Sequence, residues 1–113
     1  MAIPWYGAMP IHVLPLIMST STFDWDARKN RENAEKHGVW FSDAQRAFAD
    51  PRRVIAEDTT HSQSEKRYFC FGIVDGGVLT VRFTWRAGVI RIFGAGYWRK
   101  GKNIYERENQ VQR

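Results

Sequence analysis

The segment 78–96, VLTVRFTWRAGVIRIFGAG, limits the possible folds of this chain more than any other part of the sequence. Apolar and polar residues alternate on both sides of Ala87-Gly88, as they do in two β-strands with one buried face. Because Ala87-Gly88 has the length of a tight hairpin loop, the segment predicts two antiparallel strands. The predicted pairs are Arg86 with Val89, Thr84 with Arg91, and Trp85 with Ile90.

The two faces of this predicted hairpin differ in chemistry. One face brings together Arg82, Arg86 and Arg91. Since three guanidiniums on one face repel one another, we expect an anionic group to bind there. The opposite face is apolar and contains Leu79, Val81, Phe83, Trp85, Ile90 and Ile92.

The net charge of +5 comes entirely from the C-terminal end of the chain. Residues 1–20 carry no charged side chain, and residues 21–85 carry ten basic and ten acidic ones. Residues 86–113 carry seven basic side chains against two acidic ones. Such asymmetry is typical of proteins that bind RNA, DNA or an acidic protein, and a solvated basic face is the competing interpretation.

The length of 113 residues favours one small domain, which we assign to residues 21–113. Residues 1–20 form an apolar extension, too short and too rich in proline to cross a membrane as a helix, and without the basic start of a signal peptide. We expect translation to begin at Met18 and the extension to be dispensable.

The single cysteine, Cys70, leaves no internal disulfide and fits a reducing compartment, so we expect a cytoplasmic protein that does not associate with membranes. Cys70 stands in an apolar run and is predicted to be a buried, inert thiol. No Cys/His spacing indicates zinc, and His61 and Glu65, four residues apart, lie on a predicted loop. We therefore expect neither a metal nor a cofactor.

The remaining pattern predicts an α+β fold with two N-terminal helices, an antiparallel sheet of about four strands, and a C-terminal helix. Asp26 is suited to cap a first helix that Gly38 ends. Ser42 is suited to cap a second helix, which Pro51 stops. The helices are predicted at 27–37, 43–49 and 102–110, and strands outside the hairpin at 23–25, 54–57 and 66–74.

The register between the third strand and the hairpin depends on the turn Asp75-Gly76-Gly77. A two-residue loop would place Tyr68, Cys70 and Gly72 toward the core. A three-residue loop would instead place Phe69, Phe71 and Ile73 there and bury more apolar surface, so we prefer it. Tyr68 would then lie on the arginine face.

Several short motifs follow one another along residues 23–106. They are FDWD at 23–26, Asn33-x-x-Lys36-His37-Gly38-Val39, Phe48-x-Asp50-Pro51, Asp58-x-x-His61-Ser62-x-x-Glu65-x-Arg67, Thr84-x-Arg86, Arg91-Ile92 and Tyr105-Glu106. In this order the set resembles the BrnT family of toxins. The resemblance implies a RelE-like ribonuclease fold and a toxin that inhibits translation by cleaving RNA. It also implies a BrnA-like antitoxin, a heterotetramer of two toxins and two antitoxins, and repression of the operon through operator DNA that only the antitoxin contacts.

One segment departs from the pattern of the family. After the Arg-Ile step, members usually read Ser-Ala-Arg, whereas this chain reads Gly94-Ala95-Gly96-Tyr97-Trp98. The serine and the arginine are therefore missing. Basic residues of the closing helix, Arg99, Lys100 and Lys102, are candidates to replace the lost charge.

RNA cleavage through the 2′-hydroxyl needs a base, cations that stabilise the phosphorane, and an acid for the leaving oxygen. His61 can exchange a proton near neutral pH, and Glu65 is the alternative base or the orienter of an arginine. The residues predicted to take part in catalysis are His61, Glu65, Arg67, Arg82 and Arg86. Those predicted to bind RNA are Tyr68, Thr84, Arg91, Arg99, Lys100 and Lys102.

Structural roles compete with these assignments. His61 with Ser62 could cap the loop, and Glu65 and Arg67 could form a cross-strand ion pair. His37 precedes a helix-ending glycine, and we assign it a structural role at the helix C-terminus. Two functions therefore stay open: an endoribonuclease toxin, and a non-catalytic toxin-like subunit that binds the antitoxin within a DNA-binding repressor complex.

Overall fold

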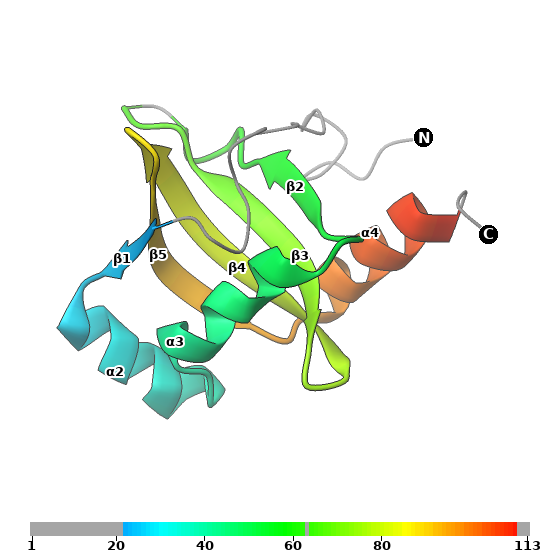
Figure 1. Ribbon diagram of the computed structural model, residues 1–113, viewed down its shortest axis with the longest axis horizontal. Coiled ribbons are helices and arrows are strands. Elements are labelled where there is room, and N and C mark those ends of the chain that lie inside the picture. The colour runs from blue at the N-terminus through cyan, green and yellow to red at the C-terminus, as the bar shows by residue number, and fades with distance from the viewer. Residues whose placement is uncertain (1–21, 63, 111–113) are drawn as a thin grey trace.

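The computed structural model describes residues 22–62 and 64–110, so the predicted extension and the predicted start at Met18 lie outside the described residues. A five-stranded sheet with the order β1-β5-β4-β3-β2 forms the centre of the molecule (Figure 1). The elements are β1 (Thr22–Trp25), α2 (Ala27–His37), α3 (Phe41–Ala44), the 3₁₀-helix η1 (Gln45–Ala49), β2 (Val54–Glu57), β3 (Tyr68–Val74), β4 (Gly77–Arg86), β5 (Val89–Gly96) and α4 (Arg99–Gln110).

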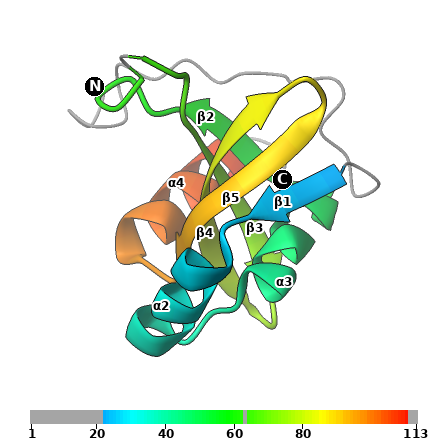
Figure 2. The same cartoon turned by 90° about the vertical axis from the view of Figure 1, so that its left-hand side faces the viewer.

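The sheet is mixed, because β1 pairs with β5 in parallel while the other neighbouring strands are antiparallel (Figure 2). The α+β class is confirmed, but the prediction of an antiparallel sheet of about four strands is wrong. Alternation of apolar residues predicts a strand but does not predict the strand with which it pairs. The four residues of β1 pair with a strand from the opposite end of the chain, with Thr22 beside Val89.

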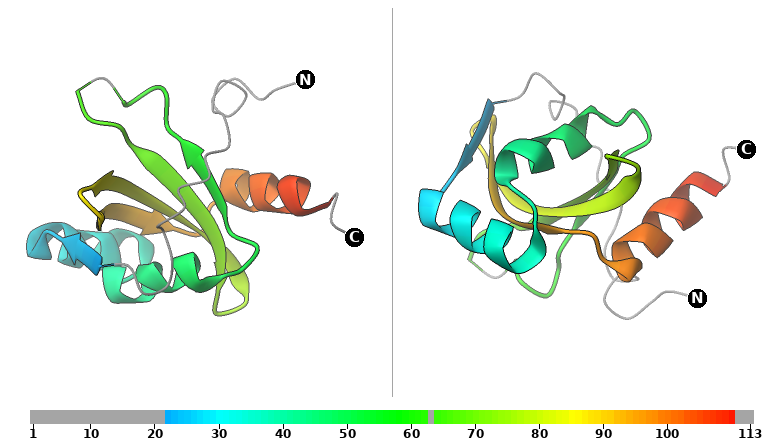
Figure 3. Two further views of the ribbon diagram at one scale, coloured as in Figure 1. Left: turned by 45° about the horizontal axis from the view of Figure 1, so that its top comes forward. Right: turned by 90° about the horizontal axis from the view of Figure 1, so that it is seen from below.

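Both faces of the sheet are covered, by different helices (Figures 1 and 3). On one face, Phe41 and Phe48 from α3 and η1 pack with Leu79, Val81 and Phe83 of β4. On the other face, Ile104 and Tyr105 of α4 pack with Val54, Ala56 and Phe71. The arginines of β4 lie on this second face, beyond the part that α4 covers.

The predicted hairpin of β4 and β5 is confirmed, with Arg86 beside Val89, Thr84 beside Arg91, and Trp85 beside Ile90. Ala87 and Gly88 both have positive φ, at 52° and 81°, as a two-residue type I′ turn requires. The ladder carries one irregularity between Arg82 and Phe83, which pair with Gly94 and Ile92. Phe93 is therefore the extra residue of a β-bulge.

The preferred register between β3 and β4 is wrong. Val74 pairs with Gly77 across the two-residue turn Asp75-Gly76, whose φ angles are 53° and 85°. Tyr68, Cys70 and Gly72 consequently face the first core, as in the alternative that we set aside. Burial did not discriminate between the registers, because α4 covers the face on which Phe69 and Phe71 lie. Gly72 also requires this register, since a Cβ there would lie 2.3 Å from the carbonyl oxygen of Ala47.

The first helix is confirmed in full: α2 spans Ala27–His37, Asp26 accepts a hydrogen bond from the Lys29 N–H at 2.9 Å, and Gly38 ends the helix with φ 71°. The second is wrong in detail. It begins at Phe41, with Trp40 rather than Ser42 at its N-cap, and continues as the 3₁₀-helix η1. The closing helix begins at Arg99 instead of residue 102.

Gly101 is tolerated inside α4 because the helix packs closely on the sheet at this point. A Cβ on Gly101 would lie 1.9 Å from the Thr80 hydroxyl and 3.1 Å from the Phe71 ring. The loss of helix propensity at a glycine is thus offset by contact with β3 and β4. The glycine that argued for a later helix start is the residue that allows α4 to dock.

The carboxylate of Asp50 joins three parts of the fold. It accepts hydrogen bonds from the Tyr105 hydroxyl at 2.6 Å, the Ile73 N–H at 2.8 Å and the Arg52 N–H at 2.8 Å. Burial alone would raise the pKa of Asp50, but these hydrogen bonds outweigh it and keep the pKa below its usual value. The Phe48-x-Asp50-Pro51 and Tyr105-Glu106 motifs are therefore linked through a structural contact that holds α4 on the sheet.

This contact makes the stability sensitive to alkaline pH. Burial, followed by the hydrogen bond to Asp50, raises the pKa of Tyr105 from 10.0 to about 12. A raised pKa gives stability that is fully present below pH 10 and is lost as the pH rises through 12. We expect the free energy of unfolding of wild type to fall by roughly 2–3 kcal/mol more than that of Tyr105→Phe between pH 9 and pH 12. Urea unfolding at both pH values measures this, and a constant difference between the two proteins would contradict it.

Candidate functional site

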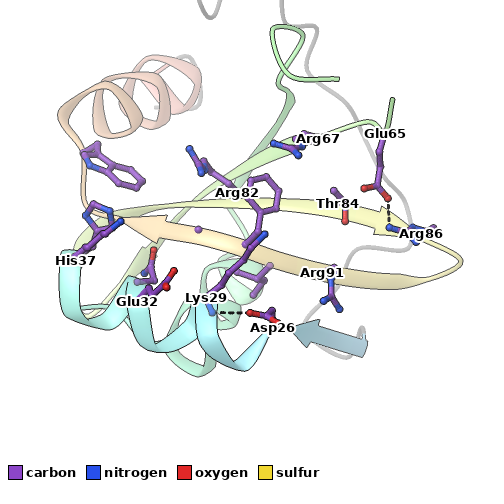
Figure 4. A pocket seen from close by; sticks show the side chains of 16 residues that line it. Asp26, Lys29, Glu32, His37, Glu65, Arg67, Arg82, Thr84, Arg86 and Arg91 are labelled. Carbon is purple, nitrogen blue, oxygen red and sulfur yellow. Dashed lines mark hydrogen bonds and ion pairs between the residues drawn. The ribbon is translucent and has the colours of Figure 1, made fainter. Parts of the chain in front are cut away.

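A cavity of about 470 Å³ lies between α2 and the arginine face of the sheet; we call it the arginine cavity (Figure 4). Its walls come from α2, from the segment before β3, from β4 and β5, and from the residue that precedes α4. The lining residues are Asp26, Lys29, Glu32, Asn33, Lys36, His37, Glu65, Arg67, Arg82, Thr84, Arg86, Arg91, Ile92, Phe93, Gly94 and Trp98.

Asn33 fixes the wall that α2 contributes. It is the buried residue of this helix, and its side-chain amide donates to the carbonyls of Val39 and Ala95, both at 2.9 Å. Its Oδ1 accepts from the N–H of Ala95 at 3.1 Å. A polar helix is therefore held against β5 by hydrogen bonds to the backbone rather than by an apolar stripe.

The lining of the arginine cavity is strongly basic. Six of its side chains carry positive charge and three carry negative charge, an excess of three cations. Enclosure between a helix and a sheet strengthens the field of these charges, so the cavity favours an anion. The cations are Lys29, Lys36, Arg67, Arg82, Arg86 and Arg91, and the anions are Asp26, Glu32 and Glu65.

Two of the arginines are neutralised by carboxylates. Arg86 forms an ion pair with Glu65, at one end of the arginine cavity (Figure 4). Arg91 forms an ion pair with Asp24, its neighbour across the β1–β5 ladder. Each of these guanidiniums already has an anionic partner, which an incoming anion would have to replace.

Arg67 and Arg82 are held differently. Their guanidinium carbons lie 4.9 Å and 5.2 Å from the centre of the Phe93 ring. Among residues 22–62 and 64–110, no carboxylate lies within ion-pair distance of either guanidinium. Stacking on an aromatic ring orients a guanidinium while leaving its N–H groups available. These two arginines are the cations of the cavity best prepared to receive an anion.

The β-bulge and a glycine make this arrangement possible. The bulge places Phe93 and Gly94 in succession on the arginine face, whereas Ile92 and Ala95 face the core. A Cβ on Gly94 would lie 3.0 Å from Nε of Arg82, so the missing side chain gives the guanidinium room. The glycine at this position thus has a local structural consequence.

Six of the predicted site residues line the arginine cavity: Glu65, Arg67, Arg82, Thr84, Arg86 and Arg91. Glu65 pairs with Arg86 and not with Arg67, the ion pair considered as its structural role. The predicted RNA-binding residue Tyr68 lies on the opposite face, where it is 8% exposed and stacks on Phe83 at 5.5 Å. Its predicted place on the arginine face is wrong, because it followed from the incorrect register.

The other predicted residues lie outside the lining. His61 is exposed, and its Nδ1 is 2.9 Å from a carboxylate oxygen of Asp58 and 2.9 Å from the Thr60 hydroxyl. Burial would raise the pKa of Asp58, but hydrogen bonds from Thr60 and His61 keep it below its usual value. Arg99, Lys100 and Lys102 lie on α4; Lys102 pairs with Glu106 at 3.0 Å.

Several residues of the arginine cavity were missed by the sequence analysis. From α2 they are Lys29, Glu32, Asn33, Lys36 and His37, which follow the i, i+3, i+4, i+7, i+8 spacing of one helix face. Polar residues that recur with the spacing usual for a buried apolar helix face are a signal that could have identified them. Phe93 and Trp98 had no such signal, because their positions depend on the bulge and on the close approach of glycines.

Cys70 is confirmed as a buried thiol, and burial raises its pKa. Across the described ranges, no group of three His, Cys, Asp or Glu side chains is arranged to hold a metal ion. The helices of the same part of the chain include none with the length and apolar character needed to cross a membrane.

Comparison with known proteins identifies the family. Residues 25–101 match the family model described as the ribonuclease toxin, BrnT, of type II toxin–antitoxin systems. No curated protein matches the chain significantly. The match covers most of the chain and includes the whole of α2, β4 and β5, which build the arginine cavity. This chain therefore belongs to the BrnT family of ribonuclease toxins of type II toxin–antitoxin systems.

Proposed function

We propose that the arginine cavity binds the phosphodiester backbone of RNA and is the place of its cleavage. The observation that carries this proposal is the pair Arg67 and Arg82, oriented on Phe93 and without a carboxylate partner among the described residues. A guanidinium fork matches the oxygens of a phosphate, and the same contact stabilises the extra charge of a phosphorane. The residues that bind the substrate would therefore also lower the barrier.

Proton transfer in this proposal belongs to His37. It lines the arginine cavity, at the end of α2, whereas His61 is held by Asp58 outside the lining (Figure 4). Glu65 takes its alternative role as the group that orients Arg86. Imidazole nitrogens can accept and donate protons, so His37 can serve the 2′-hydroxyl or the leaving oxygen.

The two histidines can be separated by matched substitutions. We expect His37→Gln to reduce RNA cleavage by about 100-fold or more, because proton transfer contributes at that scale, and His61→Gln to leave the rate within about 3-fold of wild type. Cleavage of a fluorescent single-stranded RNA by purified protein measures both. The reverse order of the two effects would return proton transfer to His61.

The same proposal covers the cellular role. The toxin inhibits translation in the cytoplasm by cleaving RNA, within a RelE-like fold, and a BrnA-like antitoxin neutralises it. An acidic or otherwise complementary antitoxin segment that occupied the arginine cavity would exclude RNA, and no other mechanism of inhibition would be needed. Toxin and antitoxin would form a heterotetramer that represses the operon and contacts operator DNA only through the antitoxin.

Induction of the chain without an antitoxin tests this function. We expect growth arrest together with cleaved transcripts. Normal growth with intact RNA would instead support a non-catalytic subunit of a repressor complex. The absence of the serine and arginine of the family at Gly94 and Gly96 favours that alternative. Against it, Gly94 gives room to Arg82, the guanidinium on which cleavage depends in our proposal.

A further inference from the structure

A second, smaller cavity shares two side chains with the arginine cavity. Its volume is about 260 Å³, just below the usual range of about 300–1,000 Å³ for small-molecule sites, so it suits a single ring system. Its walls combine two aromatic, two small and two basic residues. They are Phe69, Thr80, Arg82, Trp98, Lys100 and Gly101, of which Arg82 and Trp98 also line the arginine cavity.

Trp98 is held in place between these two cavities. A Cβ on Gly96 would lie 2.6 Å from the Trp98 ring, so only glycine lets the indole lie against the end of β5. The ring of His37 meets the indole edge-to-face, with centres 5.2 Å apart and planes at 76°. These two contacts set the orientation of the ring before any ligand binds, which lowers the entropy lost on binding.

Part of the Trp98 side chain nevertheless stays accessible to solvent. Its exposed fraction is 38%, high for a large aromatic side chain. In the described part of the chain, no hydrogen bond involves its indole N–H, and the ring packs edge-to-face against His37. An oriented, accessible aromatic ring with a free donor is suited to stack on a planar group and to donate to it.

We propose that Trp98 is the stacking platform for a nucleobase, the base next to the phosphate that Arg82 binds. This inference rests on the proposed function, because it takes the anion of the arginine cavity to be RNA phosphate. Since Arg82 lines both cavities, a strand whose phosphate lies at Arg82 directs the adjoining base toward the smaller cavity. Such stacking requires an unpaired base, so the substrate is a single-stranded segment.

Binding of a single-stranded RNA oligonucleotide, measured by fluorescence anisotropy, tests the proposal. The probe carries 2′-O-methyl groups so that it cannot be cleaved, and its partner has the same length and charge but no bases. We expect Trp98→Ala to weaken binding of the intact probe by about 10-fold, the scale of one base–aromatic stack, and to leave binding of the base-free probe unchanged.

Two further variants give this test its controls. Trp98→Leu keeps an apolar side chain at the same place and is expected to lose the same affinity, because the planar ring is what the base requires. Trp40→Ala removes a tryptophan that is 48% exposed and outside both cavities, and is expected to bind the two probes as wild type does. Thermal unfolding of each variant shows that the fold is retained.

The outcomes separate this inference from the function on which it rests. Equal binding of the intact probe by wild type and Trp98→Ala would overturn the inference, as would an equal loss for both probes. If wild type binds neither probe, or if Arg82→Ala binds as wild type does, the proposed function fails and the base site fails with it. A loss for Arg82→Ala but not for Trp98→Ala would reject the base site alone.

Discussion

Replacing Arg82 with alanine is expected to reduce RNA cleavage by about 100- to 1,000-fold, the usual effect of removing one preorganised donor to a developing anion. Arg82 is exposed, stacks on Phe93 and faces no carboxylate among the described residues. Its removal therefore takes away binding and transition-state stabilisation without breaking a structural ion pair. Cleavage of a fluorescent RNA by purified wild type and variant measures the effect, and induction of the variant should permit growth.

The expected loss depends on position and not on charge alone. Arg31→Ala removes the same charge from an exposed site on α2 outside the arginine cavity, and it should cleave at the wild-type rate. Arg82→Lys keeps the charge but loses the planar fork, so an intermediate rate is expected. Equal losses for Arg31→Ala and Arg82→Ala would mean that general attraction, and not a phosphate site at Arg82, governs activity.

Arg86 and Arg91 should matter less than Arg82. Both are in ion pairs, with Glu65 and Asp24, so an RNA phosphate gains their charge only by displacing a carboxylate. The alternating sequence of the hairpin gives no reason to distinguish the three arginines. They differ in their contacts with residues outside β4, which the alternation does not predict. Local sequence was enough to predict an anion-binding face. The relative importance of its three arginines could be assigned only from the tertiary contacts.

The hairpin itself could be predicted because every local signal agrees. Alternation defines both strands, Ala87-Gly88 has the length of a type I′ turn, and the observed pairs follow from that turn alone. The same reasoning failed at Asp75-Gly76, where two registers each give an apolar face. Our choice assumed one buried face, while α4 buries the other. Register is poorly determined by burial when both faces of a sheet are covered.

The wall formed by α2 was missed for a related reason. Its sequence has a thin apolar side, which suggests a helix that is weakly attached. The structure attaches it to β5 through Asn33, whose side-chain amide is hydrogen-bonded to backbone groups of Val39 and Ala95. Hydrogen bonds of this kind leave no periodic apolar pattern, so apolar periodicity did not reveal that Lys29, Lys36 and His37 face the sheet.

Replacement of Asn33 should accordingly destabilise the fold strongly. We expect Asn33→Ala to lower the free energy of unfolding by about 3 kcal/mol, because three hydrogen bonds of about 1 kcal/mol each are lost and buried groups of Ala95 are left unpaired. For a domain of this size, that corresponds to a fall in melting temperature of roughly 10–20 °C. Thermal and urea unfolding measure it.

Two comparisons show whether the hydrogen bonds are responsible. Asn103→Ala changes an exposed asparagine on α4 and should shift stability by less than about 0.5 kcal/mol. Asn33→Asp keeps the shape and the Oδ1 acceptor but turns an oxygen toward the carbonyls of Val39 and Ala95, so it should destabilise at neutral pH at least as much as alanine. If Asn33→Asp were as stable as wild type, the two donated bonds would not be what holds α2 on β5. Because α2 carries Lys29, Lys36 and His37, its attachment through Asn33 is also a condition for the arginine cavity to exist.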